Sequence, residues 1–251
     1  MRFNQTSRIV LVMKFEPALV KATLIKRYKR FLVDATLENG ELVTAHCPNT
    51  GSMKGLLNKG ADIWLSPATD PRRKLRYTLE MIQTPDSLVG VHTGRPNKLV
   101  QQAIERGQLK EHFPDWHQLK MEQKYGQNSR IDILLEQENG RNCFIEVKNV
   151  TLREDDAGLF PDAVTSRGAK HLSALSAEAE KGHRAVMFYL VQRTDCHIFR
   201  PASGIDPFYT DELGKAVAAG VEVLAYSCAL SPHEGITLNH QLPVDISRAN
   251  V

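Results

Sequence analysis

Hydrophobic and polar positions alternate in short runs over the first third of the chain. Between residues 22 and 83, β-branched and aromatic residues are interrupted by Asn39-Gly40, by 48–51, by 58–60 and by Ser66-Pro67. Breaks rich in Asn, Gly and Pro are typical of turns between neighbouring strands. About five strands in so short a stretch fit a small OB-like barrel better than a sandwich. We therefore expect an all-β, OB-like barrel over residues 14–85.

After Gly94 the pattern mixes helical and strand periods. Leu99, Val100, Ala103 and Ile104 recur at helical spacing until the glycine at 107. Further elements are expected in the order strand, strand, strand, helix, strand, helix, strand, over residues 120–125, 130–136, 142–149, 162–181, 185–191, 206–219 and 221–226. The leading order αβββαβ predicts an α/β domain over residues 86–251, and the whole chain an α+β protein of two domains.

Composition places the chain among ordinary folded proteins. Hydrophobic residues make up 42% and charged residues 24%, which are near globular averages. The four cysteines, at 47, 143, 196 and 228, show no zinc-type spacing, so reduced thiols are expected. The apolar run 9–13 is too short for a signal peptide or a membrane span, which favours a cytoplasmic protein. Residues 1–13 either belong to the fold or form an extension without a role.

The strand 143–148 carries the most distinctive chemistry. Strand alternation places Glu146 and Lys148 on one face, and Ile145 and Val147 on the other. Asp132 lies on the preceding strand, which a short turn brings back beside Glu146. Asp132 and Glu146 are therefore candidate ligands for Mg²⁺ or Mn²⁺, and Lys148 is a candidate catalytic group for phosphodiester cleavage.

Two acids are weaker members of this set. Glu122 lies on the neighbouring strand and is a possible further catalytic residue, whereas Glu105 lies off the apolar face of the first helix. An alternative interpretation makes Glu146 and Lys148 a charge pair on a solvated face. Charges that interrupt a largely apolar strand favour a metal or substrate site, because burial of unpaired charge is costly.

Basic side chains gather in three places. The helix predicted after residue 162 carries Arg167, Lys170 and His171 on one expected basic face, with Asp162 as a candidate helix cap. Two stretches of the barrel mix cations with aromatic rings, which suits phosphate contacts and base stacking, although solvated faces remain an alternative. Their candidate DNA-binding residues are Lys26, Arg27, Tyr28, Lys29, Arg30, Phe31, Arg72, Arg73, Lys74 and Arg76. The net charge of +3 is too small to decide the matter alone.

Several of these segments form a specific pattern. They are ATLIKRYKRFLVDA at 22–35, HCPNTGSM at 46–53, KYGQNSRIDILL at 124–135, FIEVKNVTL at 144–152 and FPDAVTSRGAKHL at 160–172. With them the sequence resembles the sugar fermentation stimulation protein A family, from about residue 17 to 243. The resemblance implies an OB-like domain, a restriction-endonuclease-like domain, DNA binding with little sequence preference, and a regulatory role in maltose or other sugar metabolism.

The resemblance also aligns the nuclease-like pattern with Asp132, Glu146 and Lys148. The acid that related nucleases carry on the first helix has no unambiguous match, since Asn97 or Gln102 fits that position. Three functions stay open: a DNA-binding regulator that keeps a nuclease-like metal site, an active magnesium-dependent nuclease, and a protein-interaction module. The sequence does not distinguish single-stranded from double-stranded DNA.

Overall fold

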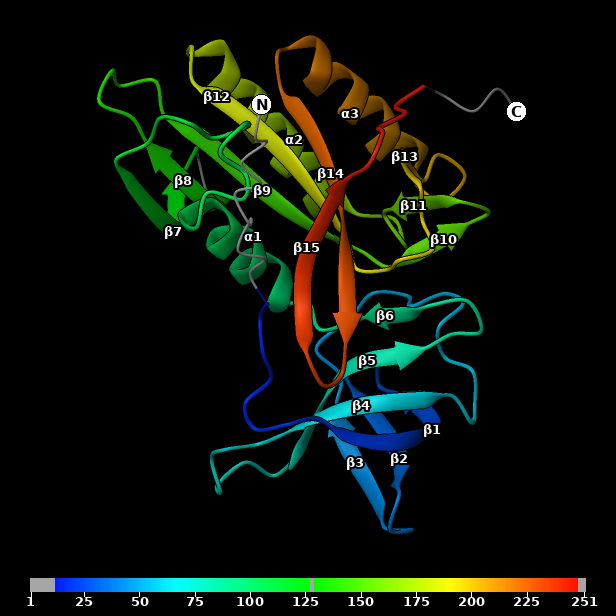
Figure 1. Cartoon of the computed structure of the whole chain (residues 1–251). Helices are drawn as coiled ribbons and strands as arrows, with labels where there is room; N and C mark the ends of the chain where they lie inside the picture. The colour runs from blue at the N-terminus through cyan, green and yellow to red at the C-terminus, as the bar shows by residue number, and fades with distance from the viewer. Residues whose placement is uncertain (1–11, 127–128, 248–251) are drawn as a thin grey trace, which may run out of the picture.

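The structure is a computed structural model that describes residues 12–126 and 129–247. The N-terminal part is a small barrel, seen at the bottom of Figure 1. Its strands follow in the order β3-β2-β1-β4-β5-β6, and an extra β3–β5 pairing closes the first five into a barrel. The strands are β1 (Val20–Tyr28), β2 (Leu32–Leu37), β3 (Leu42–His46), β4 (Asp62–Pro67), β5 (Tyr77–Gln83) and β6 (Leu88–Gly90).

Alternation along these strands produces the barrel core. In β2, Val33, Ala35 and Leu37 are buried, whereas the residues between them are only partly buried. Apolar side chains from β1, β4 and β5 meet them inside the barrel. The expected all-β barrel is therefore confirmed, although β6 carries the sheet beyond residue 85.

The C-terminal part is a mixed six-stranded sheet covered by helices on both faces. The strand order is β15-β14-β12-β9-β8-β7, with β9, β12 and β14 parallel. Its strands are β7 (Gln118–Tyr125), β8 (Ser129–Glu136), β9 (Cys143–Val150), β12 (Arg184–Val191), β14 (Glu222–Ser231) and β15 (Gly235–Gln241). The helices are α1 (Arg95–Glu105), α2 (Ser166–Glu180) and α3 (Pro207–Ala218).

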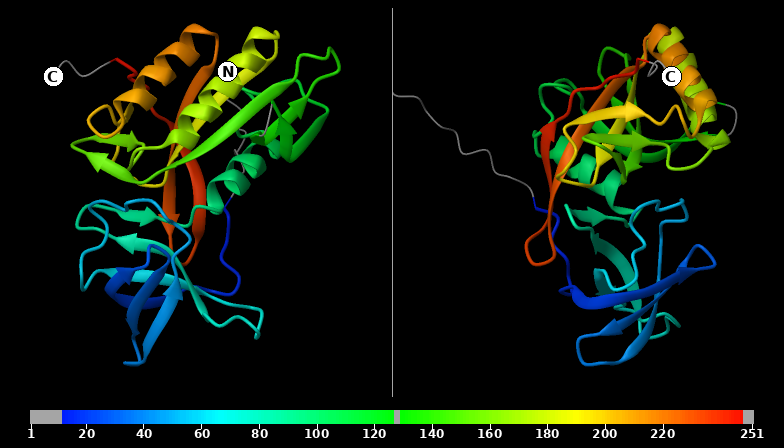
Figure 2. Two further views of the ribbon diagram at one scale, coloured as in Figure 1. Left: turned by 180° about the vertical axis from the view of Figure 1, so that it is seen from behind. Right: turned by 90° about the vertical axis from the view of Figure 1, so that its right-hand side faces the viewer.

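Each face of this sheet has its own core. Ile145 and Val147 of β9 pack with the apolar face of α1, and Phe144 packs on the other side with residues of α2 and α3. Figure 2 shows α2 and α3 together on one face and α1 on the opposite face. The expected order αβββαβ is confirmed, and Glu146 lies on the face that α2 covers.

Two features differ from the sequence expectations. A small sheet of β10 (Leu152–Glu154), β11 (Ala157–Phe160) and β13 (Ile198–Pro201), and the edge strand β15, were not predicted. Three or four residues give too little alternation to reveal a strand, and β15 ends in polar residues. Helix α2 begins at Ser166 rather than at 162, because the Thr165 hydroxyl accepts the Gly168 N–H as N-cap.

The segment before β1 is partly integrated into the C-terminal sheet. Met13 exchanges two backbone hydrogen bonds with Ile236, of 2.7 and 3.0 Å, and its side chain is buried in the α1-side core. Met13 therefore belongs to the fold. The rest of the expected extension, residues 1–11, lies outside the described residues.

The two parts touch at several points. The β14–β15 hairpin extends down to the barrel (Figure 1). Beside it, the Gly90 N–H donates at 3.0 Å to the carbonyl of Gln192, which follows β12. A Cβ on Gly90 would lie 2.5 Å from Gln192 Oε1, so a larger residue at position 90 would displace the Gln192 side chain. Arg153 of β10 bonds both Asp86, in the β5–β6 turn, and Asp195. These contacts fix the barrel against the sheet.

Candidate functional site

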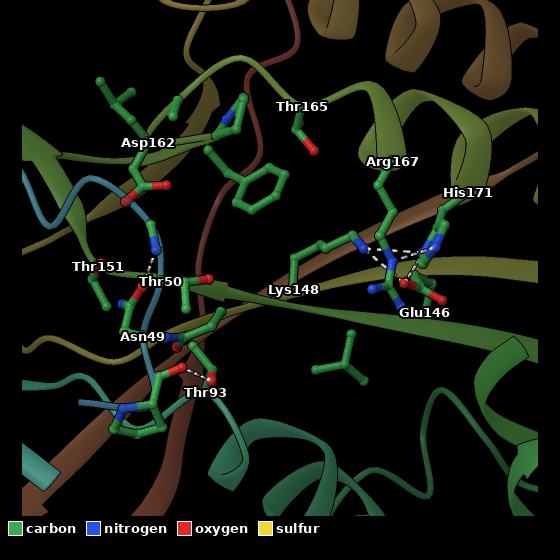
Figure 3. Close-up of a pocket in the computed structure, with 18 of the residues that line it drawn as sticks. Asn49, Thr50, Thr93, Glu146, Lys148, Thr151, Asp162, Thr165, Arg167 and His171 are labelled. Carbon is green, nitrogen blue, oxygen red and sulfur yellow. Dashed lines mark hydrogen bonds and ion pairs between the residues drawn. The ribbon is translucent and has the colours of Figure 1, made fainter. Parts of the chain in front are cut away.

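A cavity of about 500 Å³ lies where the barrel meets the C-terminal sheet. Figure 3 shows Lys148, Arg167 and His171 directed toward Glu146 on one side of it, and Asn49 and Thr50 on the other. The polar and charged residues that line it are Arg30, Asn49, Thr50, Thr93, Asn97, Asp132, Glu146, Lys148, Asn149, Thr151, Asp162, Thr165, Arg167 and His171. The cavity thus combines residues of both parts of the chain.

Asp132 and Glu146 face each other where the β8–β9 ladder ends. The last paired residues are Ile133 and Ile145, and one step further along this register Asp132 stands opposite Glu146. The Val147 N–H donates to Asp132 Oδ2 at 2.8 Å, and Asn97 Nδ2 donates to Asp132 Oδ1 at 2.8 Å. The expected approach of Asp132, Glu146 and Lys148 is present in the fold, and all three line the same cavity.

Glu146 is the most deeply buried of these groups, with 2% of its side chain exposed. Lys148 Nζ donates to Glu146 Oε1 at 2.6 Å, and His171 Nδ1 also contacts this oxygen. The other oxygen, Oε2, is buried and has no hydrogen-bond partner in the described structure. A solvated charge pair is therefore the wrong description of Glu146 and Lys148, because the carboxylate is shielded from water.

The pKa values of the two carboxyl groups are shifted in opposite directions. Burial acts to raise the pKa of Glu146, but the His171 hydrogen bond and the charge of Lys148 outweigh it and lower this pKa. Burial, and then the nearby charge of Glu146, raise the pKa of Asp132 to about 6, against the hydrogen bond from Val147. A buried pair of acids with separated pKa values is a common feature of functional sites.

Asn97 resolves the ambiguity about the first helix. Its carboxamide reaches Asp132 and lines the cavity, whereas Gln102 does not line it. The position near the carboxylates is therefore occupied by a neutral amide. Sequence spacing alone left both residues possible, because both lie on the same short helix and the sequence does not show which of them faces the strand that carries Asp132.

Comparison with known proteins identifies the two parts. Residues 25–91 match the SfsA N-terminal OB domain, and residues 94–234 match the sugar fermentation stimulation protein RE domain. The chain belongs to the sugar fermentation stimulation protein family. The barrel is thus the OB domain of this family, as its closed five-stranded form indicates.

Individual relatives cover nearly the whole chain. A sugar fermentation stimulation protein homolog from Paramagnetospirillum magneticum is 48% identical, over 94% of this chain and 99% of the relative. One from Nitrosococcus oceani is 49% identical, over 93% of this chain and 100% of the relative. The solved structure of Pyrococcus furiosus SfsA in complex with Ca²⁺ matches with a TM-score of 0.80 and 25% identity, covering 94% of this chain and 99% of that one.

On the RE side, the expected basic face of α2 is divided. Arg167 is exposed at the cavity and donates through Nε to His171 Nε2 at 3.3 Å. His171 is buried against Glu146 rather than presented to solvent. Lys170 is exposed and lines a neighbouring groove instead of the cavity, since adjacent positions 170 and 171 point about 100° apart around the helix. The single basic face predicted from sequence is therefore wrong.

The two additional acids lie outside the cavity. Glu122 is exposed on β7, where a φ of 53° interrupts the regular pairing with β8. Glu105 is exposed near the end of α1 and accepts a hydrogen bond from Gln101. Neither carboxylate lines the site, so Glu122 is corrected from a catalytic candidate to a surface residue.

Of the first basic stretch of the OB barrel, only Arg30 lines the cavity. It donates to the Thr50 carbonyl at 2.6 and 2.9 Å, whereas Arg27 donates to the carbonyls of Arg30, Asn49 and Gly51. Arg27 therefore holds the loop after β3 in place rather than extending freely. Lys26 pairs with Asp34 and lies over the Tyr28 ring, and Lys29 and Phe31 are exposed beside the turn.

The second basic stretch lies at the opposite end of β1. Val20, at the start of β1, pairs with Leu65 near the end of β4, and the stretch follows directly in the β4–β5 loop. Arg72 forms an exposed ion pair with Asp70 at 2.9 Å. None of Arg72, Arg73, Lys74 and Arg76 lines the cavity. Of the two basic stretches that the sequence grouped, only the first therefore contributes a residue to the cavity.

Asp162 joins the RE domain to the OB loop. Its carboxylate accepts the Met53 N–H at 3.1 Å and the Ser52 hydroxyl at 3.2 Å, so it does not cap α2 as expected. A Cβ on Gly51 would lie 2.6 Å from Asp162 Oδ2, which explains glycine at this position. Sequence reasoning missed this contact, since the partners are 109 and 110 positions apart.

Other features of the described residues limit the chemistry. All four cysteines are buried and free of disulfides, as expected. No group of three or more His, Cys, Asp or Glu side chains in residues 12–126 and 129–247 is arranged to hold a metal ion. Within the same ranges no helix is long and apolar enough to cross a membrane.

Proposed function

We propose that this protein binds DNA with little sequence preference and holds one divalent cation, Mg²⁺ or Mn²⁺, between Asp132 and Glu146. The observation that carries the proposal is Glu146 Oε2, a buried carboxylate oxygen without a partner, opposite a second carboxylate whose pKa is raised. A buried polar atom without a partner is costly, and a cation would remove that cost at Glu146 and relieve the repulsion between the two carboxylates.

Two carboxylates are a suitable protein contribution to such a site. Mg²⁺ commonly uses one or two carboxylates, and completes its coordination with waters and substrate phosphate oxygens. When bound, such an ion polarises a phosphate and makes its water more acidic. The relative from Pyrococcus furiosus, solved in complex with Ca²⁺, supports cation binding in this family.

The surrounding cations suit a phosphodiester. The ammonium group of Lys148 lies between Glu146 and His171, where it can offset negative charge that develops on a phosphate. Arg167 and Arg30 border the same cavity and can contact flanking phosphates. Contacts of this kind position a nucleic acid without reading its bases, which explains why we expect little sequence preference.

Asn97 favours a second candidate, a DNA-binding regulator without turnover. A neutral amide, rather than a third acid, stands beside Asp132 and donates to it, which leaves fewer negative ligands for a metal. A regulator of maltose or other sugar metabolism needs to bind DNA but does not need to cleave it. The relatives are named for the stimulation of sugar fermentation, which supports a role in sugar metabolism.

Calorimetric titration of Mn²⁺ into the wild type and three variants tests the metal site. We expect Asp132→Ala and Glu146→Ala to abolish binding, and Lys148→Ala to retain it, because an ammonium group is not a metal ligand. Each protein is then incubated with single-stranded, duplex and branched DNA and Mg²⁺ or Mn²⁺. Cleavage by the wild type, lost in all three variants, supports the active nuclease.

Glu122→Ala is the matched control, because this acid lies outside the cavity. Metal binding by the wild type without cleavage of any DNA supports the regulator. Equal Mn²⁺ affinity in the wild type and Asp132→Ala would refute the metal site. If substitution of the cationic side chains around the cavity leaves the DNA affinity unchanged, the proposed DNA-binding role is refuted.

A further inference from the structure

The groups proposed for chemistry are recessed in the cavity that the OB loop borders. Glu146 and Lys148 have 2% and 13% of their side chains exposed. Residues 48–51 of the loop form the opposite wall of the cavity. The loop is held on the barrel side by Arg27 and Arg30 and on the RE side by Asp162. Thr93 adds a hydrogen bond to the Pro48 carbonyl at 3.1 Å, so this wall is fixed from both domains.

The size of the cavity limits what reaches them. About 500 Å³ is the size of a pocket that holds one small organic molecule. A nucleotide with its phosphate has this scale, whereas the major groove of duplex DNA alone is roughly 12 Å wide. A base-paired helix therefore meets the loop and the start of α2 before its phosphates reach Glu146.

An apolar groove continues from this cavity. It has a volume of about 420 Å³ and shares Val164 and Thr165 with the site. Val164 is 78% exposed and Phe208 60% exposed, which makes them two of the most exposed large apolar side chains in the described residues. Single exposed apolar residues are ordinary, but these two line one groove beside a charged cavity.

Phe208 lies in the first turn of α3, and hydrogen bonds fix the start of this helix. The buried Asp206 carboxylate caps α3 by accepting the Tyr209 N–H at 2.9 Å, and it accepts the Thr165 N–H at 2.8 Å. This one side chain therefore holds the starts of α2 and α3 together. A ring presented from a rigid helix start is a suitable platform for a stacked base.

The charges beside the groove match a nucleic-acid strand. Arg167 lies at the cavity and Lys170 lines the groove, so cations stand on the path from Phe208 to Glu146. The acid Glu212 also lines the groove, but its carboxylate is paired with Lys215 at 2.7 Å. Alternating apolar and cationic surface fits the alternation of base and phosphate along a single strand.

We propose that the site takes a single nucleic-acid strand, with an unpaired base stacked on Phe208 and the adjacent phosphate directed toward Lys148 and Glu146. The inference rests on the proposed function and specifies its substrate class. A single strand fits better than an intact duplex, because the bases of a duplex are already stacked on each other and a base-paired helix is too large to enter a cavity of about 500 Å³.

Fluorescence titration without added metal tests the inference. The probe is a short oligothymidylate that contains one 2-aminopurine, a fluorescent adenine analogue quenched by stacking, and the protein carries Asp132→Ala to prevent cleavage. We expect the single strand to bind at least about tenfold more tightly than a fully paired duplex of the same length. Phe208→Ala should weaken single-strand binding about tenfold and remove the quenching, and Phe208→Trp should retain both.

Leu42→Ala is the matched control, because Leu42 is 72% exposed and lies at the far end of the barrel sheet, outside the groove. Unfolding midpoints of all variants establish that they fold. Equal affinity for duplex and single strand, or unchanged binding and quenching in Phe208→Ala, would overturn the inference. Because these titrations contain no metal, failure of the cation site leaves their outcome unaffected. Metal-dependent cleavage of duplex DNA at the wild-type rate by Phe208→Ala would reject the single-strand proposal and keep the proposed function.

Discussion

At the scale of single residues, the site depends on the different surroundings of two carboxylates, Asp132 and Glu146. Both Asp132 and Glu146 are largely removed from water, yet their pKa values move apart. Glu146 is contacted by the ammonium group of Lys148 and by the His171 ring, whereas Asp132 accepts hydrogen bonds from the neutral donors of Asn97 and the backbone. The negative charge is thereby assigned to Glu146, and Asp132 holds a proton to higher pH.

This asymmetry predicts how stability changes with pH. The folded-state pKa of Asp132 is about 6, above its ordinary 3.8, so the folded protein holds a proton that the unfolded chain releases. The contribution of Asp132 is therefore favourable below pH 4 and is lost as pH rises to about 6. With a chelator present, the free energy of unfolding of the wild type should fall relative to Asp132→Ala by up to about 3 kcal/mol over this interval.

Urea unfolding of both proteins at several pH values measures this difference. Added Mn²⁺ should remove most of the loss above pH 6 in the wild type only, because the cation replaces the proton. A difference between the two proteins that stays constant from pH 4 to about 6.5 would contradict the raised pKa.

At the scale of elements, one buried ion pair joins the OB barrel to helix α1. Glu80 of β5 is 1% exposed and accepts two hydrogen bonds from Arg95, the first residue of α1, at 2.5 and 3.0 Å. Ser66 of β4 donates to the same carboxylate at 2.8 Å. The pair fixes the start of the helix that carries Asn97, so it positions the site from a distance.

Removal of Arg95 should leave Glu80 buried without its charge partner. We expect Arg95→Ala to lower the free energy of unfolding by about 3–5 kcal/mol. Arg72→Ala is the control, since Arg72 is 88% exposed in its ion pair with Asp70. This substitution should have little effect on the free energy of unfolding, because solvent screens the pair. Chemical unfolding of the three proteins measures both values, and similar small losses would show that the buried pair is dispensable.

At the scale of the whole molecule, the cavity exists only because two domains meet. The OB domain supplies Arg30 and the loop 48–51, and the RE domain supplies the carboxylates and Arg167. The second basic stretch lies in the β4–β5 loop and none of its residues lines the cavity, so the full positive charge of the barrel does not act at the site. Binding should therefore depend on few cations.

Salt dependence distinguishes these cations. The logarithm of the DNA affinity should fall linearly with the logarithm of salt concentration, because phosphate contacts release counterions. Arg30→Ala and Arg167→Ala should each reduce the slope by about 1, whereas Arg76→Ala in the β4–β5 loop should leave it unchanged. Affinity measured at several salt concentrations with unrelated DNA sequences checks this. If Arg76→Ala reduces the slope more than Arg30→Ala and Arg167→Ala do, the DNA-binding surface includes the β4–β5 loop rather than the cavity.

The sequence by itself determined the local and pairwise features of this protein. Alternation and turn residues predicted the barrel strands and the order αβββαβ, because side-chain periods follow directly from strand and helix geometry. The same alternation placed Glu146 and Lys148 on one face of β9, and the short connection to the preceding strand brought Asp132 beside them. Neighbouring strands joined by a turn leave little freedom in their pairing.

Only the tertiary structure decided which distant residues complete the site. Asn97, His171, Asp162 and the OB loop come from separate elements, and their meeting depends on how helices and domains pack rather than on sequence spacing. Because of the same packing, Glu122, Lys170 and the second basic stretch do not line the cavity. Periodicity determines the face of a helix or strand on which a side chain lies. Which element packs against that face depends on contacts between residues far apart in the sequence.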